Sequence, residues 1–286
     1  MDPSVSRRTW RTLEPVAAMV YFVPEAQEEY AALGLDVKGN RAVGYFPARA
    51  AAMGAVSVGT VQATFFNFSR RAVEFGMTGV WESVTPEAVL AARCRGADRA
   101  LRRLAGDEVS RPAVGEALEL ARAACAGASP YGRPLYAAHA DLPWPDAPHV
   151  ALWHAITLLR EYRGDGHIAA LVGAGYTGLE AAVTHAAQAD LWSKDGLRTT
   201  RAYSKAEWQH CVDDLRARGE LDADERLTPA GAARRSQVED LTDVLAQPAW
   251  EKIGADGCAR LRDLVRPLAT AVVAGGGFPL KGEPSR

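Results

Sequence analysis

The stretch WHAITLLREYRGDGH brings several chemically capable side chains close together in the chain. Histidine is the one side chain whose ordinary pKa lies near neutrality, so His154 and His167 are the predicted general acid–base groups if the protein is an enzyme. Arg160 and Arg163 carry planar sets of donors that match a carboxylate or a phosphate, and Trp153 offers a flat apolar surface. We therefore predict these last three as ligand-binding residues.

Helical spacing separates this stretch into faces. A helix is expected over 148–162, and Leu152, Ile156 and Leu159 repeat at the spacing of a core-facing stripe. The Gly-Asp-Gly sequence after it predicts a turn, followed by a second helix over 167–174. Such a turn would return the histidine that follows it toward the arginines at the helix end.

A purely structural interpretation of the same residues stays open. Arg163 would then pair with Asp165 inside the turn. The arginines would also complement the negative, carbonyl end of the helix dipole. In that case the charges only complete a helix.

A metal site is not predicted. His154, His167, His185 and Glu161 supply ligand atoms, but no pair of them has the HxxxH or HxxEH spacing of a helical zinc site. A serine hydrolase is also excluded, because no GxSxG elbow occurs. The sequence does not identify a cofactor.

The first half of the chain adds polar residues among apolar ones. Tyr45, Arg49 and Asn67 are predicted ligand-binding residues, and Asn67 lies in the aromatic segment ATFFNF. A buried amide needs hydrogen-bond partners, which makes this asparagine unusual as a core residue. We expect a ligand pocket between the two halves of the chain, lined by these residues and by the arginine–histidine stretch.

Local signals predict a chain built mainly of α-helices, with two small hairpins. Residues 37–46 combine a Lys-Gly-Asn turn with flanking valine, tyrosine and phenylalanine, so a β-hairpin is expected there. Residues 219–228 hold two short strand-like pieces around a tight turn. Helices are expected at about 8–22, 25–34, 47–53, 57–67, 85–104, 112–126, 148–162, 167–174, 177–188 and 204–218, and from Thr228-Pro229 onward.

A helix, a small wing and a long helix, in that order, are typical of a winged helix-turn-helix. The segment AALGLDVKGNRAVGYFPARAAAMG aligns loosely with RARGELDADERLTPAGAARRS, which indicates an internal duplication. The predicted fold is therefore mainly α, with tandem winged helix-turn-helix-like units and small β-hairpin wings. We expect an N-terminal domain over 1–128, a Pro-rich linker over 129–147, a C-terminal winged-helix domain over 148–280 and a tail over 281–286.

Composition limits the class of protein. The 286 residues are 48% hydrophobic and 24% charged, with a formal net charge of −2, as expected of a globular protein. No apolar run approaches the roughly 20 residues that span a bilayer, and no signal peptide is recognised. The four cysteines are far apart and form no CxxC pair, which favours a reducing compartment. We therefore expect a cytoplasmic protein without a membrane partner.

Four segments together resemble a largely uncharacterised family of actinobacterial helix-turn-helix proteins: EPVAAMVYF, GYFPARAAAMGAVSVGTVQATFFNF, ALWHAITLLREYRGDGHIAAL and RGELDADERLTPAG. The resemblance covers nearly the whole chain, and it implies a helix-turn-helix fold. Some members are encoded near secondary-metabolite genes, and the C-terminal part alone is similar to MarR-like regulators. Members often carry a histidine where this chain has Ala17, so a metal or cofactor site that relies on that histidine is in doubt here.

Charge weighs against DNA as the partner. The expected reading helix, 204–218, carries three Lys or Arg and three Asp or Glu, and the wing ELDADERL carries four acids and one arginine. Because phosphate neutralisation dominates nucleic-acid affinity, an acidic wing weakens DNA binding. We therefore predict a small-molecule-binding protein, its enzymatic role left open, that acts on an aromatic or amphipathic anionic metabolite in secondary metabolism. The alternative is a MarR-like, ligand-responsive regulator that binds DNA; the oligomeric state is not predicted.

Overall fold

The computed structural model describes residues 1–39, 41–188 and 193–278, and the chain is mainly helical in these ranges. The expected mainly α class is confirmed. The helices, with η marking 3₁₀ helices, are α1 (Ser4–Ala18), η1 (Met19–Tyr21), α2 (Pro24–Ala32), α3 (Arg41–Ala50), η2 (Ala51–Met53), α4 (Val58–Phe65), α5 (Arg70–Met77), α6 (Val80–Ser83), α7 (Pro86–Ala105), η3 (Gly106–Ser110), α8 (Pro112–Cys125), α9 (Pro134–Ala140), α10 (Pro148–Gly173), α11 (Gly178–Gln188), α12 (Lys194–Thr200), α13 (Lys205–Ala217), α14 (Pro229–Glu251) and α15 (Gly254–Ala274).

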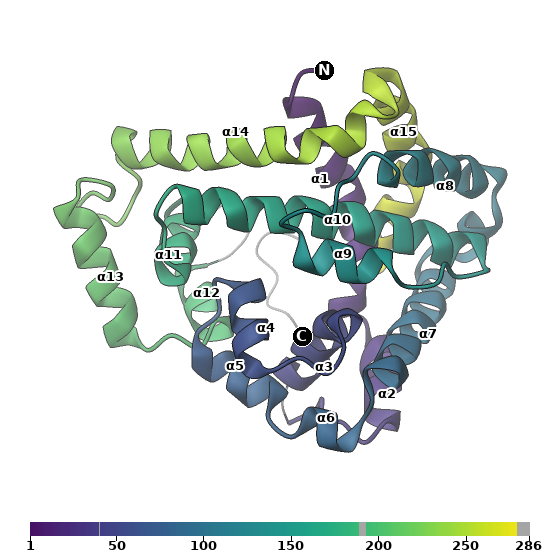
Figure 1. Cartoon of the computed structure of the whole chain (residues 1–286), viewed down its shortest axis with the longest axis horizontal. Coiled ribbons are helices and arrows are strands. Elements are labelled where there is room, and N and C mark those ends of the chain that lie inside the picture. The colour runs from purple at the N-terminus through teal and green to yellow at the C-terminus, as the bar shows by residue number, and fades with distance from the viewer. Residues whose placement is uncertain (40, 189–192, 279–286) are drawn as a thin grey trace.

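Helix α10 has 26 residues and runs through the middle of the molecule (Figure 1). Helix α14 lies along one side of it, and α1 packs against α10, α14 and α15. Helices α7 and α8 lie toward one end of the molecule, α11 to α13 toward the other, and α3 to α6 below α10 in the view of Figure 1. Helix α10 therefore connects the two ends.

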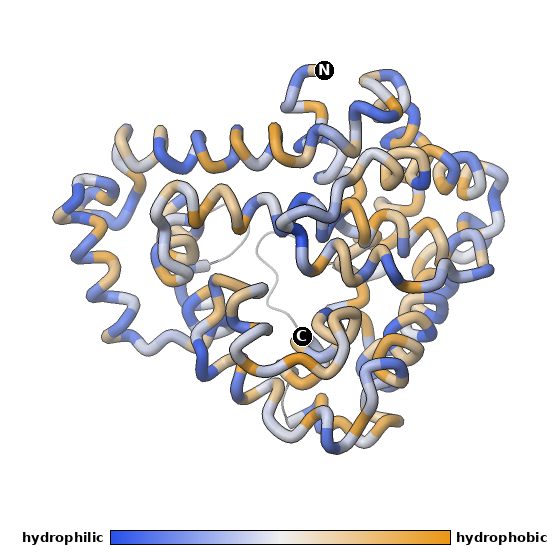
Figure 2. Tube along the Cα trace, in the orientation of Figure 1, coloured by the Kyte–Doolittle hydropathy of each residue, from blue (hydrophilic) through white to orange (hydrophobic). Residues whose placement is uncertain are grey.

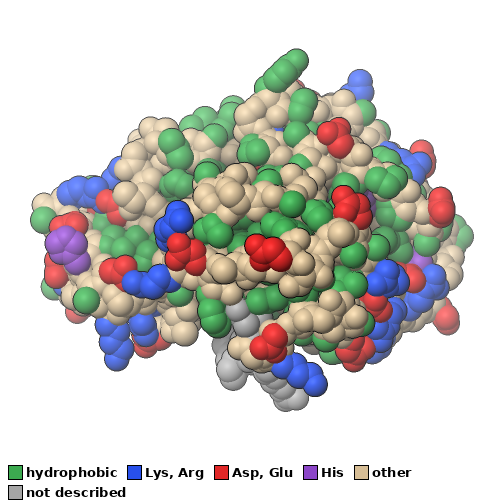
Figure 3. All heavy atoms as spheres, turned by 60° about the horizontal axis from the view of Figure 1, so that its bottom comes forward, with side chains coloured by type: hydrophobic (Ala, Val, Ile, Leu, Met, Phe, Trp, Pro, Cys, Tyr) green, Lys and Arg blue, Asp and Glu red, His purple; other side chains and the backbone are tan. Residues whose placement is uncertain are grey.

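Burial of apolar side chains explains this arrangement. Leu152, Ile156 and Leu159 of α10 are all buried, as their spacing predicts. Apolar and polar residues alternate around most helices in Figure 2, as expected of helices with one buried face. On the face seen in Figure 3, Lys and Arg side chains lie among Asp and Glu, so this face presents no field of one sign.

The main core contains residues from before and after the Pro-rich segment, from Val5 in α1 to Val272 in α15. Within that segment, α9 packs on α10. The division at 129–147 stays a prediction, and the predicted tail, 281–286, lies outside the described residues. Smaller clusters lie among α3, α4 and α5 and among α11, α12 and α13.

Several helix starts follow the expected capping chemistry. The Thr85 hydroxyl accepts a hydrogen bond from the main chain of α7, and Thr228 does the same for α14. Ser204 and Glu207 form the predicted capping box at the start of α13. Local sequence was sufficient here because each cap satisfies main-chain amides within its own turn.

The hairpin expected at 37–46 is wrong, because α3 occupies most of that segment. Phe46 and Ala50, four residues apart, are buried against Val73 of α5, which is the spacing of one helix face. The strand propensity of aromatic and β-branched residues depends on what they pack against. Here packing against α5 favours a helix. The Asn40 of the expected turn lies outside the described residues.

The C-terminal wing expected at 219–228 is reduced to an isolated bridge between Leu221 and Leu227, and the described ranges contain no strand. The Asp222 side chain accepts from the main-chain amides of Asp224 and Arg226 and closes the loop locally. The tip is therefore a side-chain-capped turn, too short for a ladder. The predicted tandem winged units with β-hairpin wings are therefore not supported within the described ranges; α11, α12 and α13 precede this turn and α14 in the chain.

The turn expected at Gly-Asp-Gly is also wrong, since α10 continues through it. Gly166 lies directly against the Arg133 guanidinium, which a Cβ would meet. The Asp165 carboxylate accepts from the amides of Leu135 and Tyr136 at 3.0 and 2.9 Å and caps the start of α9. Both residues thus serve the packing of α9 on α10, which local sequence rules do not contain.

Candidate functional site

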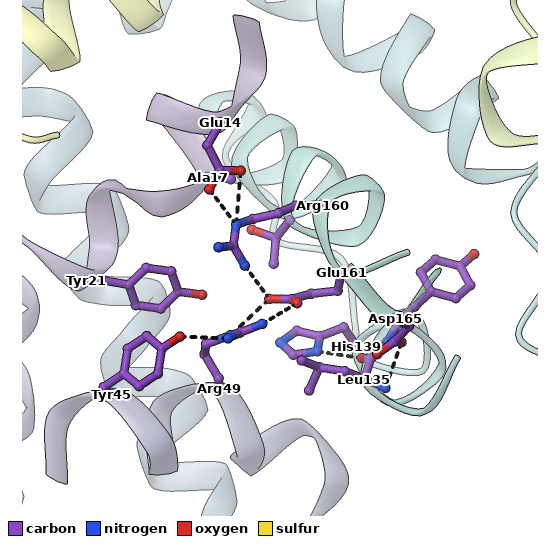
Figure 4. A network of polar contacts seen from close by, with 12 residues as sticks. Glu14, Ala17, Tyr21, Tyr45, Arg49, Leu135, His139, Arg160, Glu161 and Asp165 are labelled. Carbon is purple, nitrogen blue, oxygen red and sulfur yellow. Dashed lines mark hydrogen bonds and ion pairs between the residues drawn. The ribbon is translucent and has the colours of Figure 1, made fainter. Parts of the chain in front are cut away.

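A network of buried charges lies where α1, α3 and α10 meet (Figure 4). Its centre is Glu161, whose side chain is 1% exposed. Arg49 approaches it with two donors, Nε at 3.2 Å from Oε1 and Nη2 at 2.6 Å from Oε2. This bidentate pair joins α3 to α10, two helices that are far apart in the sequence.

Arg160 extends the network to α1. Its Nη1 lies 3.2 Å from Oε1 of Glu161, and its Nε lies 3.1 Å from both carboxylate oxygens of Glu14. Charges therefore alternate along a row from Glu14 to Arg49. The two arginines are not fully buried, since the side chain of Arg160 is 21% exposed and that of Arg49 is 12% exposed.

Aromatic rings surround the arginines. The Tyr45 hydroxyl accepts from Nη1 of Arg49 at 2.8 Å, and the rings of Tyr21 and Tyr45 pack edge to face with centroids 5.2 Å apart. The guanidinium carbon of Arg49 lies 4.6 Å from the centre of the Phe65 ring, and that of Arg160 lies 5.5 Å from the centre of Tyr21. Cations over ring faces at these distances are attracted by the ring quadrupole.

Arg93 of α7 is a further, buried arginine beside this group. Its Nη1 lies 3.3 Å from Nε2 of His139, and its Nη2 lies 3.4 Å from the Tyr21 hydroxyl. Nδ1 of His139 faces the Leu135 carbonyl at 2.8 Å and donates to it, which leaves Nε2 to accept from Arg93. Arg93 also lies over the Trp153 ring at 4.9 Å. Within the described ranges it forms no ion pair.

We call these residues the arginine–tyrosine cluster; its members are Glu14, Tyr21, Tyr45, Arg49, Arg93, His139, Arg160 and Glu161. Burial alone would raise the pKa of Glu161, but Arg49 and Arg160 outweigh it and lower that pKa to about 2. Burial and the neighbouring Arg93 lower the pKa of His139 to about 3. At neutral pH the carboxylate is therefore charged and the imidazole is neutral.

A second group of charges lies farther along α10, against α14. Arg163 donates to Asp243 at 2.8 Å and to Glu239 at 3.3 Å, and it lies over the Trp10 ring at 4.8 Å. The pairing of Arg163 with Asp165 is wrong, because that carboxylate caps α9 instead. Arg163 thus connects α10 to α14 and lies outside the arginine–tyrosine cluster.

The two predicted catalytic histidines also lie apart from that cluster. His167 faces the Thr242 hydroxyl at 3.0 Å and Glu239 at 3.8 Å. His154 is 5% exposed, packs edge to face on Trp144, and its Nε2 has no hydrogen-bond partner in the described structure. Burial is the main cause that lowers the pKa of each ring to about 4. Both are neutral at pH 7.

The remaining predicted residues are distributed around the cluster. Trp153 is buried, and its indole nitrogen donates to the Ala17 carbonyl at 3.4 Å. Asn67 lies in the turn after α4, where its main chain lies close to Gly178 at the start of α11. Of the predicted ligand-binding residues, the structure brings three into the cluster: Tyr45, Arg49 and Arg160.

Sequence reasoning missed several members of the cluster. Glu14 and Tyr21 are seven residues apart, so a shared helix face was readable, but nothing local indicated that this face meets α10. Arg93 and His139 lie on α7 and α9, and each resembles an ordinary helix residue in sequence. Their meeting depends on how the helices pack.

Two concave regions of the described part lie away from the centre of the expected pocket. A gap beside Arg160, Glu14 and Trp250 holds essentially no free volume. An open recess of about 400 Å³ lies elsewhere, bordered by α7, α8 and the start of α10, with Arg102 and His149 on its rim. The pocket between the two halves therefore stays a prediction.

The described ranges contain neither a metal-binding group of side chains nor a membrane-spanning helix. No group of three or more His, Cys, Asp or Glu side chains is placed to hold a metal ion. No helix there combines the length and the apolar character needed to cross a membrane. All four cysteines are unpaired.

Comparison with known proteins yields one match. The model of a helix-turn-helix family matches residues 6–279. Neither the curated proteins nor the solved structures contain a match to the chain. The family match covers both predicted halves, including the helices that carry the cluster.

Proposed function

The chain belongs to this helix-turn-helix family, and on that premise we propose that it is a small-molecule-binding protein whose ligand is an aromatic or amphipathic anion. The binding site is the arginine–tyrosine cluster. A place in actinobacterial secondary metabolism is part of the proposal and is based on the sequence resemblance alone.

The charge balance of the cluster is the observation that carries the proposal. Arg49, Arg93 and Arg160 contribute three positive charges, and Glu14 and Glu161 contribute two negative ones. Within the cluster, positive charges therefore exceed negative ones by one. Burying an unpaired charge is costly, and an anionic ligand removes that cost when it binds.

The surroundings favour an aromatic ligand. The rings of Tyr21, Tyr45 and Phe65 lie within a few ångströms of the arginines, and both tyrosines are only partly buried. Aromatic rings prefer edge-to-face or offset contacts with other rings, and such pairs add to the gain from apolar burial. An acidic group on a flat ring system would thus use both the guanidinium donors and the tyrosine faces.

An enzymatic role for His154 and His167 remains a prediction. Neither ring lies in the cluster, and at neutral pH both are neutral, which suits a general base better than an acid. Arg163 and Asn67, likewise outside the cluster, stay predicted ligand contacts. Four unpaired cysteines support the expected cytoplasmic localisation.

The alternative function is a MarR-like regulator that binds DNA. The family match and the order of α11 to α14 support it. Against it, Arg216 donates to two carbonyls of the wing loop and pairs with Asp213, and Arg218 pairs with Glu180 and Glu220. Both arginines already have partners within the chain, so contacts with DNA phosphates would have to replace these hydrogen bonds and ion pairs.

Calorimetric titration tests the ligand proposal with two probes of equal shape. The probes are 2-naphthoate, which is anionic, and 2-naphthamide, which is neutral. We expect the anion to bind at least tenfold more tightly. Equal binding of the two, or no binding of the anion, overturns the proposal.

A matched pair of variants locates the site. Arg160→Gln removes one of the three positive charges of the cluster and is expected to weaken naphthoate binding at least tenfold. Arg7→Gln is the control, because Arg7 also pairs with two acids, Asp240 and Asp243, but lies outside the cluster. Its affinity should stay within twofold of the wild type. An Arg160→Gln variant that binds as the wild type does would place the ligand elsewhere.

A further inference from the structure

The turn of the helix-turn-helix unit contributes an arginine that the proposed site does not yet use. Arg201 follows α12 directly, and its guanidinium lies over the Phe68 ring at 4.5 Å. Phe68 packs in turn against Tyr45, with centroids 5.6 Å apart. The guanidinium therefore reaches the aromatic wall of the arginine–tyrosine cluster from the opposite half of the chain.

Arg201 has no counter-ion within the described ranges. Its one side-chain hydrogen bond goes to the Thr200 hydroxyl at 3.0 Å, and its Nε is buried without a partner. Burial lowers the pKa of Arg201, and the like charge of Arg49 acts in the same direction. A half-buried arginine beside another arginine is unfavourable unless an anion lies between them.

The main chain at Arg201 and Ala202 is hydrogen-bonded to residues of the N-terminal half. The Ser69 amide donates to the Arg201 carbonyl at 3.0 Å, and the Ser69 hydroxyl donates to the Ala202 carbonyl at 3.0 Å. Arg71 donates to the same Ala202 carbonyl at 3.0 Å and pairs with Glu207 of α13 at 2.5 Å. Ala202 has a φ of 54°, a left-handed conformation that costs an alanine free energy.

We infer that Arg201 is the second anion-binding group of the site, so that the ligand is an aromatic dianion of the aryl phosphate class held between the two halves of the chain. With Arg201 the excess over the two acids of the cluster, Glu14 and Glu161, rises from one positive charge to two. A phosphate monoester carries nearly two negative charges above pH 7 and has three acceptor oxygens, enough for guanidinium groups on two sides.

The same geometry couples the site to the helix-turn-helix unit. An anion that bridges Arg201 and the cluster ties the α12–α13 turn to α3, which carries Tyr45 and Arg49. Since the turn already bonds α5 and α13 through Ser69 and Arg71, a bound ligand holds α13 in its present position. This inference rests on the proposed function and adds the charge of the ligand and the element that responds to it.

The test compares 2-naphthyl phosphate with 2-naphthoate at pH 7.5 by calorimetric titration. The wild type should bind the phosphate at least tenfold more tightly than the carboxylate. Arg201→Gln should reduce this preference to threefold or less, and Arg201→Lys should restore part of it. Lys205→Gln is the control, because it removes one exposed positive charge from the same turn; it should keep the preference of the wild type.

Hydrogen exchange followed by mass spectrometry provides the second readout. Saturating 2-naphthyl phosphate should slow amide exchange in residues 201–208 at least fivefold in the wild type and not in Arg201→Gln. Suppose that the wild type binds naphthoate. This inference is then overturned if the wild type shows no preference for the phosphate, if that preference survives Arg201→Gln, or if amide exchange at the turn is unchanged; the proposed function would still stand. Failure of the wild type to bind naphthoate would overturn both.

Discussion

Replacing Glu161 with glutamine tests the electrostatic account of the site. The substitution keeps the shape of the side chain and removes its charge. Arg49 and Arg160 then lose the carboxylate they share, and Arg49 is left without an acid among the described residues. We expect the free energy of unfolding at pH 7 to fall.

The magnitude follows from the pKa of the group. That pKa lies near 2 instead of the ordinary 4.5, and each pKa unit corresponds to about 1.4 kcal/mol, which gives about 3–4 kcal/mol in favour of the charged form. Breaking one side of a buried ion pair costs about 3–5 kcal/mol in other proteins, which agrees. Because the folded-state pKa is depressed, this stabilisation is present above pH 4.5 and is lost as the pH falls toward 2.

Urea denaturation followed by circular dichroism measures the effect. Glu14→Gln is the matched control, since Arg160 keeps Glu161 as a partner and Glu14 is more exposed; it should cost about 1 kcal/mol or less. The double variant Glu161→Gln, Arg49→Met should recover part of the loss, because it removes the charge left unpaired. If Glu161→Gln unfolds within 1 kcal/mol of the wild type at pH 7, the pair is not the strong buried interaction described here.

Three further predictions concern α10. Leu159→Ala should lower the unfolding free energy by about 2–5 kcal/mol through cavity formation, while leaving naphthoate affinity per folded molecule unchanged. Gly166→Ala should cost about 1–3 kcal/mol in a chemical melt because its Cβ meets Arg133, whereas Gly164→Ala, with only an ordinary contact, should be neutral or stabilising by up to about 1 kcal/mol. His154, whose depressed pKa is near 4, contributes stability above pH 6.5 that is lost as the pH falls toward 4. His154→Gln should therefore flatten the decline of the unfolding free energy between these pH values, and an unchanged slope would contradict it.

Much of the helical framework could be predicted from local sequence. Thr85, Ser204 and Thr228 each cap a helix that begins where expected, because the bonds that define a cap lie within one turn. The burial of Leu152, Ile156 and Leu159 was also predicted from their spacing, but the structure buries every residue from 149 to 159, so this part of α10 has no exposed face.

The errors have a common physical cause. Tyr45 and Phe46 have high strand propensity, but their segment is helical and packs on α5. Gly166 is typical of a turn, but it lies within α10, where its lack of a Cβ leaves room for the Arg133 guanidinium. In both places the conformation is set by a contact with a residue far away in the sequence, and not by the local preference of the residue type. Rules of local conformation do not contain that contact.

The site was predictable only in part, because its residues come from helices that are far apart in the sequence. Arg160 was selected as a candidate anion-binding residue, and Tyr45 and Arg49 were selected as polar residues among apolar ones; the structure brings the three together. Glu161 at the centre was considered only as a metal ligand, because its partners lie on α1 and α3. A carboxylate that neutralises arginines from other helices is visible only once those helices are packed.

The most direct test of the central claim is anomalous diffraction from crystals soaked with 6-bromo-2-naphthoate. The bromine locates the ring and the carboxylate orients it. We predict one strong bromine peak among α1, α3 and α10, with the carboxylate within hydrogen-bond distance of Arg49 or Arg160. A bromine peak confined to the recess beside Arg102 and His149, or no peak at occupancy-saturating concentration, would contradict the account.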